Sequence, residues 1–474
     1  MIKKILLNNS IKNTIYYISG TVIQKAISFV MILLYTEYLS PAELGLANII
    51  LSISTVYELI FRFAMDEAYA KFWFENRDDT TEREKVSGSI VLSSIISCLG
   101  GGILLLAFSN ILIKPFLPES MPLRYVMICV ALAVLPIPFS IFQKKLRIEE
   151  KAKKYAIYSL LSTILTVIGA TIFVIILGWG GYGYLLALAT ASIISFIISY
   201  FNLTYGVIKI YDRTNIKQLY CYAIPLVPHF ISTWGMTYFN RIAIGKILDT
   251  FSVGVYNVMN NIGMIVSMLS ISVTYVFQPW VYQQLERGEV GNKRIKRVIE
   301  LTTVAFTIAG LTISLFSIEF VHLFINERYW GGIPLISIIV AASNIAFIGN
   351  MITYIMYYNI KTVKSISRIT MSGAILNIIL TVILGNFFGL YGAAIAFLIS
   401  NSYLTEIKRY AISKRTGLNP FNKRIYLLIG ITTIICFESA LNETNVIIRI
   451  LIFGFILGSL LFLNRKNIKM VKEV

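Results

Sequence analysis

Seven charged side chains lie in or beside long apolar stretches of the sequence, where an ionised group is costly. They are Lys25, Glu58, Arg62, Asp66, Glu67, Arg241 and Lys246. A charge at the centre of a hydrocarbon layer costs about 2.5–3.5 kcal/mol on insertion scales, so each one needs a partner or a function. Lysine and arginine are suited to anions, and arginine grips phosphate oxygens with two donors. The four bases are therefore candidates for binding an anionic group, and the three acids for ion coupling or ion pairing.

A simpler interpretation is open for five of these residues. Glu58 and Arg62 are four residues apart, on one face of a helix, and can form an ion pair there. Lys246 can extend along its helix to the membrane surface. Asp66 and Glu67 follow about a turn later and can lie at the water boundary. We expect the remaining two bases, in the first and seventh apolar stretches, to line a polar path.

The sequence has no recognisable catalytic or metal-binding pattern. His229 and His322 are its only histidines, and it contains no acid pair or nucleophile–base motif. It also lacks a G-x-x-x-x-G-K-[ST] phosphate loop. None of the cysteines belongs to a C-x-x-C pair; they are Cys98, Cys129, Cys221 and Cys436. We predict no catalytic residue, no metal, no cofactor and no direct ATP coupling within the chain.

The composition indicates the elements that must position these charges. Of 474 residues, 57% are hydrophobic and 14% are charged, and the mean hydropathy is +0.74. A soluble globular protein is nearer 45–50% apolar and about 25% charged. These values exclude a disordered chain and a water-soluble enzyme, and they predict an all-α polytopic membrane protein.

Apolar segments of about 20 residues, long enough to cross a bilayer of roughly 30 Å, recur along the whole chain. Fourteen are predicted: 13–37, 43–63, 86–109, 122–142, 156–178, 183–206, 220–247, 253–281, 298–318, 333–358, 369–388, 391–407, 425–440 and 446–463. An even number of spans puts both termini on one side of the membrane.

The distribution of basic residues predicts which side that is. The loops on the side of the termini hold 33 of the 42 lysines and arginines, including the clusters 144–147 and 408–409. The positive-inside rule then puts both termini in the cytoplasm. This asymmetry also accounts for most of the net charge of +18. We interpret the clusters as topology signals that can touch anionic lipid heads, and we expect no nucleic-acid partner.

An internal repeat is indicated by two matches at one offset. LSPAELGLAN at 39–48 shares Leu, Gly and Asn positions with LDTFSVGVYN, which starts 209 residues later. Tyr182-Gly183 matches Tyr391-Gly392 at the same offset. Chance similarity among Ile/Leu-rich segments is the alternative. A repeat of this kind predicts two six-helix lobes, 1–217 and 218–424, in the same orientation, with helices 13–14 and a cytoplasmic tail appended at 425–474.

Three segments resemble a known family. They are YLSPAELG at 38–45, MDEA with KFWFE at 65–75, and NRIAIG with VGVYN at 240–257. These residues are similar to those of Wzx-type polysaccharide flippases and related polysaccharide transporters of the multidrug/oligosaccharidyl-lipid/polysaccharide exporter superfamily. The resemblance implies export of an undecaprenyl-diphosphate-linked oligosaccharide from the inner to the outer leaflet of the bacterial plasma membrane. It also implies alternating access through a cationic central cavity. Membrane lipids, a polysaccharide polymerase and glycosyltransferases are the partners to expect.

Two other functions remain open. A cation-coupled multidrug exporter on the same fold would need a buried carboxylate in its first lobe. The first helix carries Lys25 and no acid before Glu37, but Glu58 in the second helix keeps this function possible. A polyprenyl-linked membrane glycosyltransferase or polymerase would usually present larger outer loops or a catalytic intramembrane histidine, and the longest outer loops predicted here are only 109–121 and 319–332.

Overall fold

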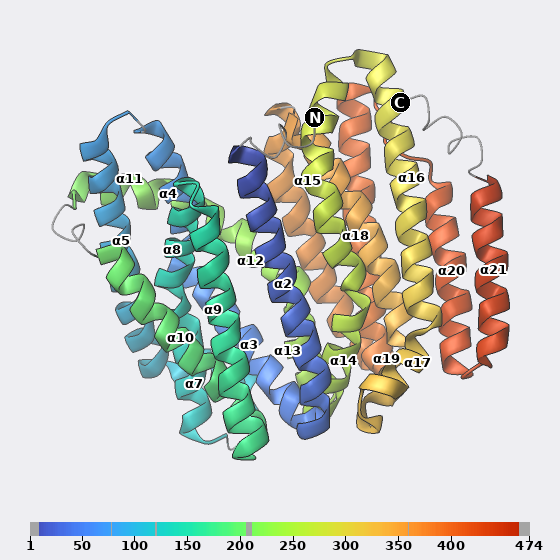
Figure 1. Cartoon of the computed structure of the whole chain (residues 1–474), viewed down its shortest axis with the longest axis horizontal. Coiled ribbons are helices and arrows are strands. Elements are labelled where there is room, and N and C mark those ends of the chain that lie inside the picture. Colours follow the sequence, from blue (N-terminus) through green and yellow to red (C-terminus); the bar gives the residue numbers. More distant parts are fainter. Residues whose placement is uncertain (1–8, 77, 119–120, 205–210, 359, 464–474) are drawn as a thin grey trace. The chain divides into compact units, whose positions relative to one another are not determined.

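The computed structural model describes residues 9–76, 78–118, 121–204, 211–358 and 360–463, and all regular elements in these ranges are helices. They form two compact units, Met1–Trp234 and Gly235–Val474 (Figure 1). The predicted all-α class is therefore confirmed. The sequence predicts a different division, with the first lobe ending at residue 217 and residues 425–474 as a separate segment. That division remains a prediction.

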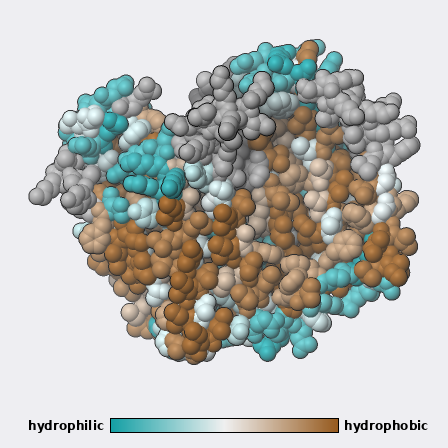
Figure 2. Space-filling view, viewed as in Figure 1, coloured by the Kyte–Doolittle hydropathy of each residue, from teal (hydrophilic) through white to brown (hydrophobic). Residues whose placement is uncertain are grey.

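Helices of membrane-spanning length dominate both units. Within the described residues, nine are long and apolar enough to cross a bilayer, and Val446–Leu460 is a shorter apolar helix. On the face shown in Figure 2, hydrophobic side chains cover the length of the helices and hydrophilic ones gather at their ends. A soluble fold could not expose apolar side chains on this scale, so the chain is a multi-pass membrane protein. The count of fourteen spans and the side of the termini stay predictions.

The first unit is a bundle in which α2 packs on α9, α3 on α7, and α10 on α8 and α9. Its main helices are α2 (Asn9–Tyr38), α3 (Pro41–Arg62), α4 (Met65–Glu75), α5 (Thr80–Ala107), α7 (Leu123–Val134), α8 (Pro136–Ile148), α9 (Ala152–Ala170), α10 (Gly180–Thr204) and α11 (Arg213–Ala223). Short helical turns, α6 (Ser109–Leu112) and η1 (Lys114–Phe116), follow α5, and η2 (Thr171–Ile176) extends α9.

Prolines divide two of the predicted spans, because a proline lacks the N–H that would continue the helical ladder. The span predicted at 122–142 is split into α7 and α8 at Pro136. The span predicted at 220–247 is divided into the end of α11, the turn η3 (Ile224–Leu226) around Pro225, α12 (Val227–Thr237) and α13 (Phe239–Ile247). Both interruptions fall at or beside a proline.

The second unit is built around α18, most of whose side chains are buried against α14, α15, α16 and α19. Besides α13, its helices are α14 (Thr250–Gly263), α15 (Ile265–Leu285), α16 (Gly288–Leu315), α17 (Ser317–Phe324), α18 (Leu335–Tyr358), α19 (Ile360–Thr416), α20 (Arg424–Leu441) and α21 (Val446–Leu463), with the turn η4 (Glu327–Gly332). The helix α19 contains both spans predicted at 369–388 and 391–407, which meet at a non-helical Gly389.

The two units share local structure at the offset of 209 residues. The Ser40 side chain accepts a hydrogen bond from the N–H of Glu43 and caps α3, and Asp249 caps α14 through the N–H of Ser252. Gly180 at the start of α10 and Gly389 within α19 have φ of 56° and 57°, a conformation that glycine adopts without steric cost. These equivalent caps and turns are what an internal repeat would produce.

The last two helices pack on the second unit, where α20 contacts α16 and α18, and α21 contacts α16. Arg449 of α21 is buried and forms a bidentate ion pair with Glu319 of α17. The same guanidinium donates a hydrogen bond of 2.8 Å to the Leu315 carbonyl. The pair fixes the rotation of α21 against the bundle, an attachment that the sequence did not indicate.

Candidate functional site

Four of the charged residues predicted in the first unit, Glu58, Arg62, Asp66 and Glu67, lie around a break in its second membrane helix. Between α3 and α4, Phe63 and Ala64 have left-handed backbone angles, with φ of 51° and 53°. For residues with a Cβ this conformation costs roughly 1–2 kcal/mol each. Ala64 is buried, so water does not compensate the break. The surrounding side chains must hold it in place.

Arg62, the last residue of α3, lies between two carboxylates. Its guanidinium is 3.5 Å from Glu58 and 3.8 Å from Asp66, which stands just beyond the break. All three side chains are less than one-fifth exposed. The buried Arg62 Nε and Asp66 Oδ1 atoms have no hydrogen-bond partner among the described residues. Arg62 therefore pairs with an acid on each side of the break, and its Nε–H is left without a hydrogen bond.

The helix α8 completes this arrangement from across the bundle. The Ser140 hydroxyl donates a hydrogen bond of 3.3 Å to Glu58, and the Lys144 ammonium is 2.9 Å from Glu67. We call Glu58, Arg62, Asp66, Glu67, Ser140 and Lys144 the charged network. Lys144 was predicted only as a topology signal, because sequence spacing did not reveal its partner on another helix. In this network a change of protonation or an incoming anion would alter contacts on both sides of the helix break.

The other predicted cations lie apart from this network. Lys25 is half-buried on α2 and has no ion pair among the described residues. In the second unit, the Arg241 guanidinium lies 5.0 Å from the centre of the Tyr238 ring, a cation–π contact, and is half-buried on α13. Lys246 is exposed near the end of the same helix. Arg241 thus has an aromatic neighbour that limits its side-chain freedom.

The second unit contains a buried cluster of neutral polar groups that the sequence reasoning missed. Asn240 of α13 accepts hydrogen bonds of 3.0 Å from Asn377 and from Thr381 of α19, and its amide donates to the Tyr256 hydroxyl at 3.3 Å. We call these four residues the amide cluster. The asparagines and threonine are at most 3% exposed. No single segment shows this cluster, because its members come from three helices.

A buried lysine corrects another sequence interpretation. Lys408 was assigned to a basic cytoplasmic loop, yet it belongs to α19 and is only 9% exposed. Its ammonium donates one hydrogen bond, of 3.4 Å, to the Gly349 carbonyl of α18. Its neighbour Arg409 pairs with Glu406 instead. Within the described part of the chain, no group of three or more His, Cys, Asp or Glu side chains could hold a metal ion.

Solved structures with this arrangement of helices are transporters. "Lipid II flippase MurJ, inward closed conformation" is 18% identical, with a TM-score of 0.71 over 96% of this chain and 100% of that one. An inward-facing multidrug resistance MATE family transporter of the MOP superfamily is 15% identical, with a TM-score of 0.63 over 88% and 96%. An outward-facing multidrug resistance MATE family transporter of the MOP superfamily is 16% identical, with a TM-score of 0.53 over 92% of this chain and 96% of that one. At these identities the likeness shows that the chain has the fold of these proteins.

The sequence comparison is more specific. The family model described as polysaccharide biosynthesis protein matches residues 10–285, which is more than half of the chain. The chain belongs to that family, and the resemblance found in the sequence is confirmed. A comparison with curated proteins gave no match.

Proposed function

We propose that the chain flips an undecaprenyl-diphosphate-linked oligosaccharide from the inner to the outer leaflet of the bacterial plasma membrane. The observation that carries the proposal is the match of residues 10–285 to the polysaccharide biosynthesis family. It is supported by Lys25 on α2 and Arg241 on α13, two bases in stretches predicted to span the membrane, where charges are costly and mark functional pathways. Transport by alternating access needs no covalent chemistry from the protein.

The proposed substrate carries the negative charge that the predicted lysines and arginines would bind. A diphosphate must leave water to cross the hydrocarbon region, and fixed cations can replace the lost hydration. In the proposal Lys25, Arg62, Arg241 and Lys246 bind phosphate oxygens in a cationic cavity. The lipid tail stays in the bilayer while the head group moves.

Complementation of a strain that lacks the gene tests this proposal. We expect Lys25→Ala and Arg241→Ala to abolish surface polysaccharide while the abundance of the protein stays normal. Lys293→Ala is the matched control, since Lys293 is an exposed base on α16. The cationic-cavity proposal fails if both test variants restore export fully. Proteoliposomes loaded with a labelled polyprenyl-diphosphate sugar would then measure flipping directly, independently of the cell's polymerase and glycosyltransferases.

Glu58 favours a second candidate, coupled export of cationic drugs. It is a carboxylate within an apolar helix, and Ser140 and Arg62 hold it in place. A proton or sodium ion exchanged at Glu58 could drive either substrate. If the same proteoliposomes transport cationic dyes but not the lipid-linked sugar, the drug exporter is the correct function.

A further inference from the structure

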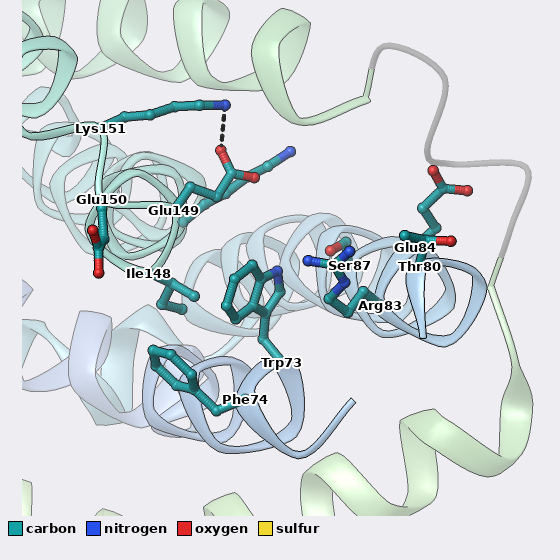
Figure 3. A pocket seen from close by; sticks show the side chains of 11 residues that line it. Trp73, Phe74, Thr80, Arg83, Glu84, Ser87, Ile148, Glu149, Glu150 and Lys151 are labelled. Carbon is teal, nitrogen blue, oxygen red and sulfur yellow. Dashed lines mark hydrogen bonds and ion pairs between the residues drawn. The ribbon is translucent and has the colours of Figure 1, made fainter. Parts of the chain in front are cut away.

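A pocket of about 740 Å³ opens on the first unit where α4 ends, α5 begins and α8 ends (Figure 3). The charged network does not line it. Trp73 of α4, Arg83 and Ser87 of α5, and Lys145 of α8 contribute to its wall. The charge asymmetry of the loops predicts that this end faces the cytoplasm. The pocket lies at helix ends, and in the predicted topology it would be near the lipid head groups of the inner leaflet.

Arg83 and Lys145 differ from the bases around them. Among the described residues neither forms an ion pair, and the buried Arg83 Nε has no hydrogen-bond partner. Nearby bases are paired within 3 Å: Lys85 with Glu82, Lys144 with Glu67, and Lys151 with Glu149. Arg83 is thus left facing the pocket without an ion pair, and Lys145, on another helix, faces it with Glu149 as its nearest counter-charge.

Among the acids of the pocket, Glu149 interacts with Lys145 but shares its carboxylate with a second base. The Glu149 carboxylate is 2.6 Å from Lys151. Glu84 and Glu150 are exposed, and Figure 3 shows the Glu84 carboxylate directed away from Trp73 and Glu150 away from Arg83. An anion could therefore approach Arg83 without meeting the Glu84 or Glu150 carboxylate, and at Lys145 it would share the site with Glu149, which Lys151 already pairs.

The aromatic side chains show what kind of anion fits. The Arg83 guanidinium lies 5.2 Å from the centre of the Trp73 ring, so one face of the guanidinium is fixed while its edge remains available. Phe74, at the rim, is 56% exposed. An exposed phenyl ring beside a cationic pocket at a membrane surface suits a ligand with an apolar part. A soluble anion would gain nothing from it.

We infer that this pocket binds the phosphate of a lipid head group, held by Arg83 and Lys145. Two lipids carry this chemistry, an anionic phospholipid and a polyprenyl diphosphate. Binding of the phosphate does not depend on the proposed transport function. If the polyprenyl lipid is the occupant, the pocket is a loading site for the transported head group.

Native mass spectrometry of the purified full-length chain tests the inference. Phosphatidylglycerol and undecaprenyl diphosphate are titrated separately against the wild type, Arg83→Gln/Lys145→Gln and Lys85→Gln. We expect at least one lipid to bind about tenfold more weakly to the double variant, with Lys85→Gln within twofold of the wild type. Weaker binding of phosphatidylglycerol alone, of undecaprenyl diphosphate alone, or of both to the double variant supports the inference. The lipid whose binding weakens is then identified as the ligand of the pocket. Wild-type binding of both lipids, or an equal loss in Lys85→Gln, overturns it.

A second measurement keeps the test decisive if the double variant unfolds. Phosphatidylglycerol or a polyprenyl phosphate carrying a head-group spin label should quench the fluorescence of Trp73. The Trp73→Phe variant should then lack the quenched component and keep its other tryptophan signal. Because Trp73→Phe leaves the charges of the pocket unchanged, identical quenching in the wild type and in this variant would overturn the inference.

Discussion

The two units place polar groups inside their helices in opposite ways. In the first unit the charged network spans a break between α3 and α4, where Arg62 lies between Glu58 and Asp66. In the second unit the amide cluster joins α13 to α14 and α19 through neutral hydrogen bonds. The units share helix caps at one offset, so the difference lies in the side chains between those caps.

This difference indicates a division of labour. Neutral hydrogen bonds, once satisfied, make a buried site rigid and do not respond to an ion. Charges in a buried network respond to any charge that enters or leaves. We therefore expect substrate or ion binding to act first on the first unit, while the amide cluster keeps α13, which carries Arg241, in a fixed orientation.

The largest effect is expected at Arg62. Arg62→Ala leaves Glu58 and Asp66 close together without a counter-charge, and breaking a buried pair in this way costs roughly 3–5 kcal/mol. We expect a clear drop in the thermal unfolding midpoint in detergent and loss of export. Glu58→Gln/Arg62→Gln/Asp66→Asn removes all three charges and should recover much of the stability without recovering transport. Full transport by this triple variant would show that the network is only structural.

A smaller loss is expected in the second unit. Asn240→Ala removes the acceptor that Asn377 and Thr381 share, and a buried unsatisfied polar group costs roughly 1–3 kcal/mol. Asn386→Ala is the matched control, because Asn386 is exposed and bonds only to its own helix. The unfolding midpoint should fall for the first variant and stay near that of the wild type for the second. Equal midpoints would mean that the amide cluster contributes nothing to the unit.

The smallest effect concerns the helix break itself. Ala64→Gly and Ala68→Gly each remove one buried methyl group, but Ala64 has a positive φ and Ala68 lies within α4. Glycine relieves strain at the first position and weakens the helix at the second, by about 1 kcal/mol. Chemical denaturation should therefore find Ala64→Gly the more stable of the two. The reverse order would mean that the break carries no strain.

Much of the fold could be predicted because it depends on local physics. Segment length and apolarity indicate where helices run, and Ser40 and Asp249 mark where two of them begin. Helices are interrupted at Pro136 and Pro225, because a proline lacks the N–H that continues the helical ladder. The spacing of Glu58 and Arg62 placed them on one helix face, where they lie 3.5 Å apart.

The amino-acid sequence alone determined the helical class, the membrane setting and the kinds of charge available, since these depend on composition and on neighbours within one helix. Only the tertiary structure decided which partner each polar group has. Lys144 meets Glu67 across 77 residues, and Asn240 meets Asn377 across 137. Such pairs depend on how each helix is rotated against the next. Sequence spacing does not encode that rotation, because it is set by the packing of the whole bundle.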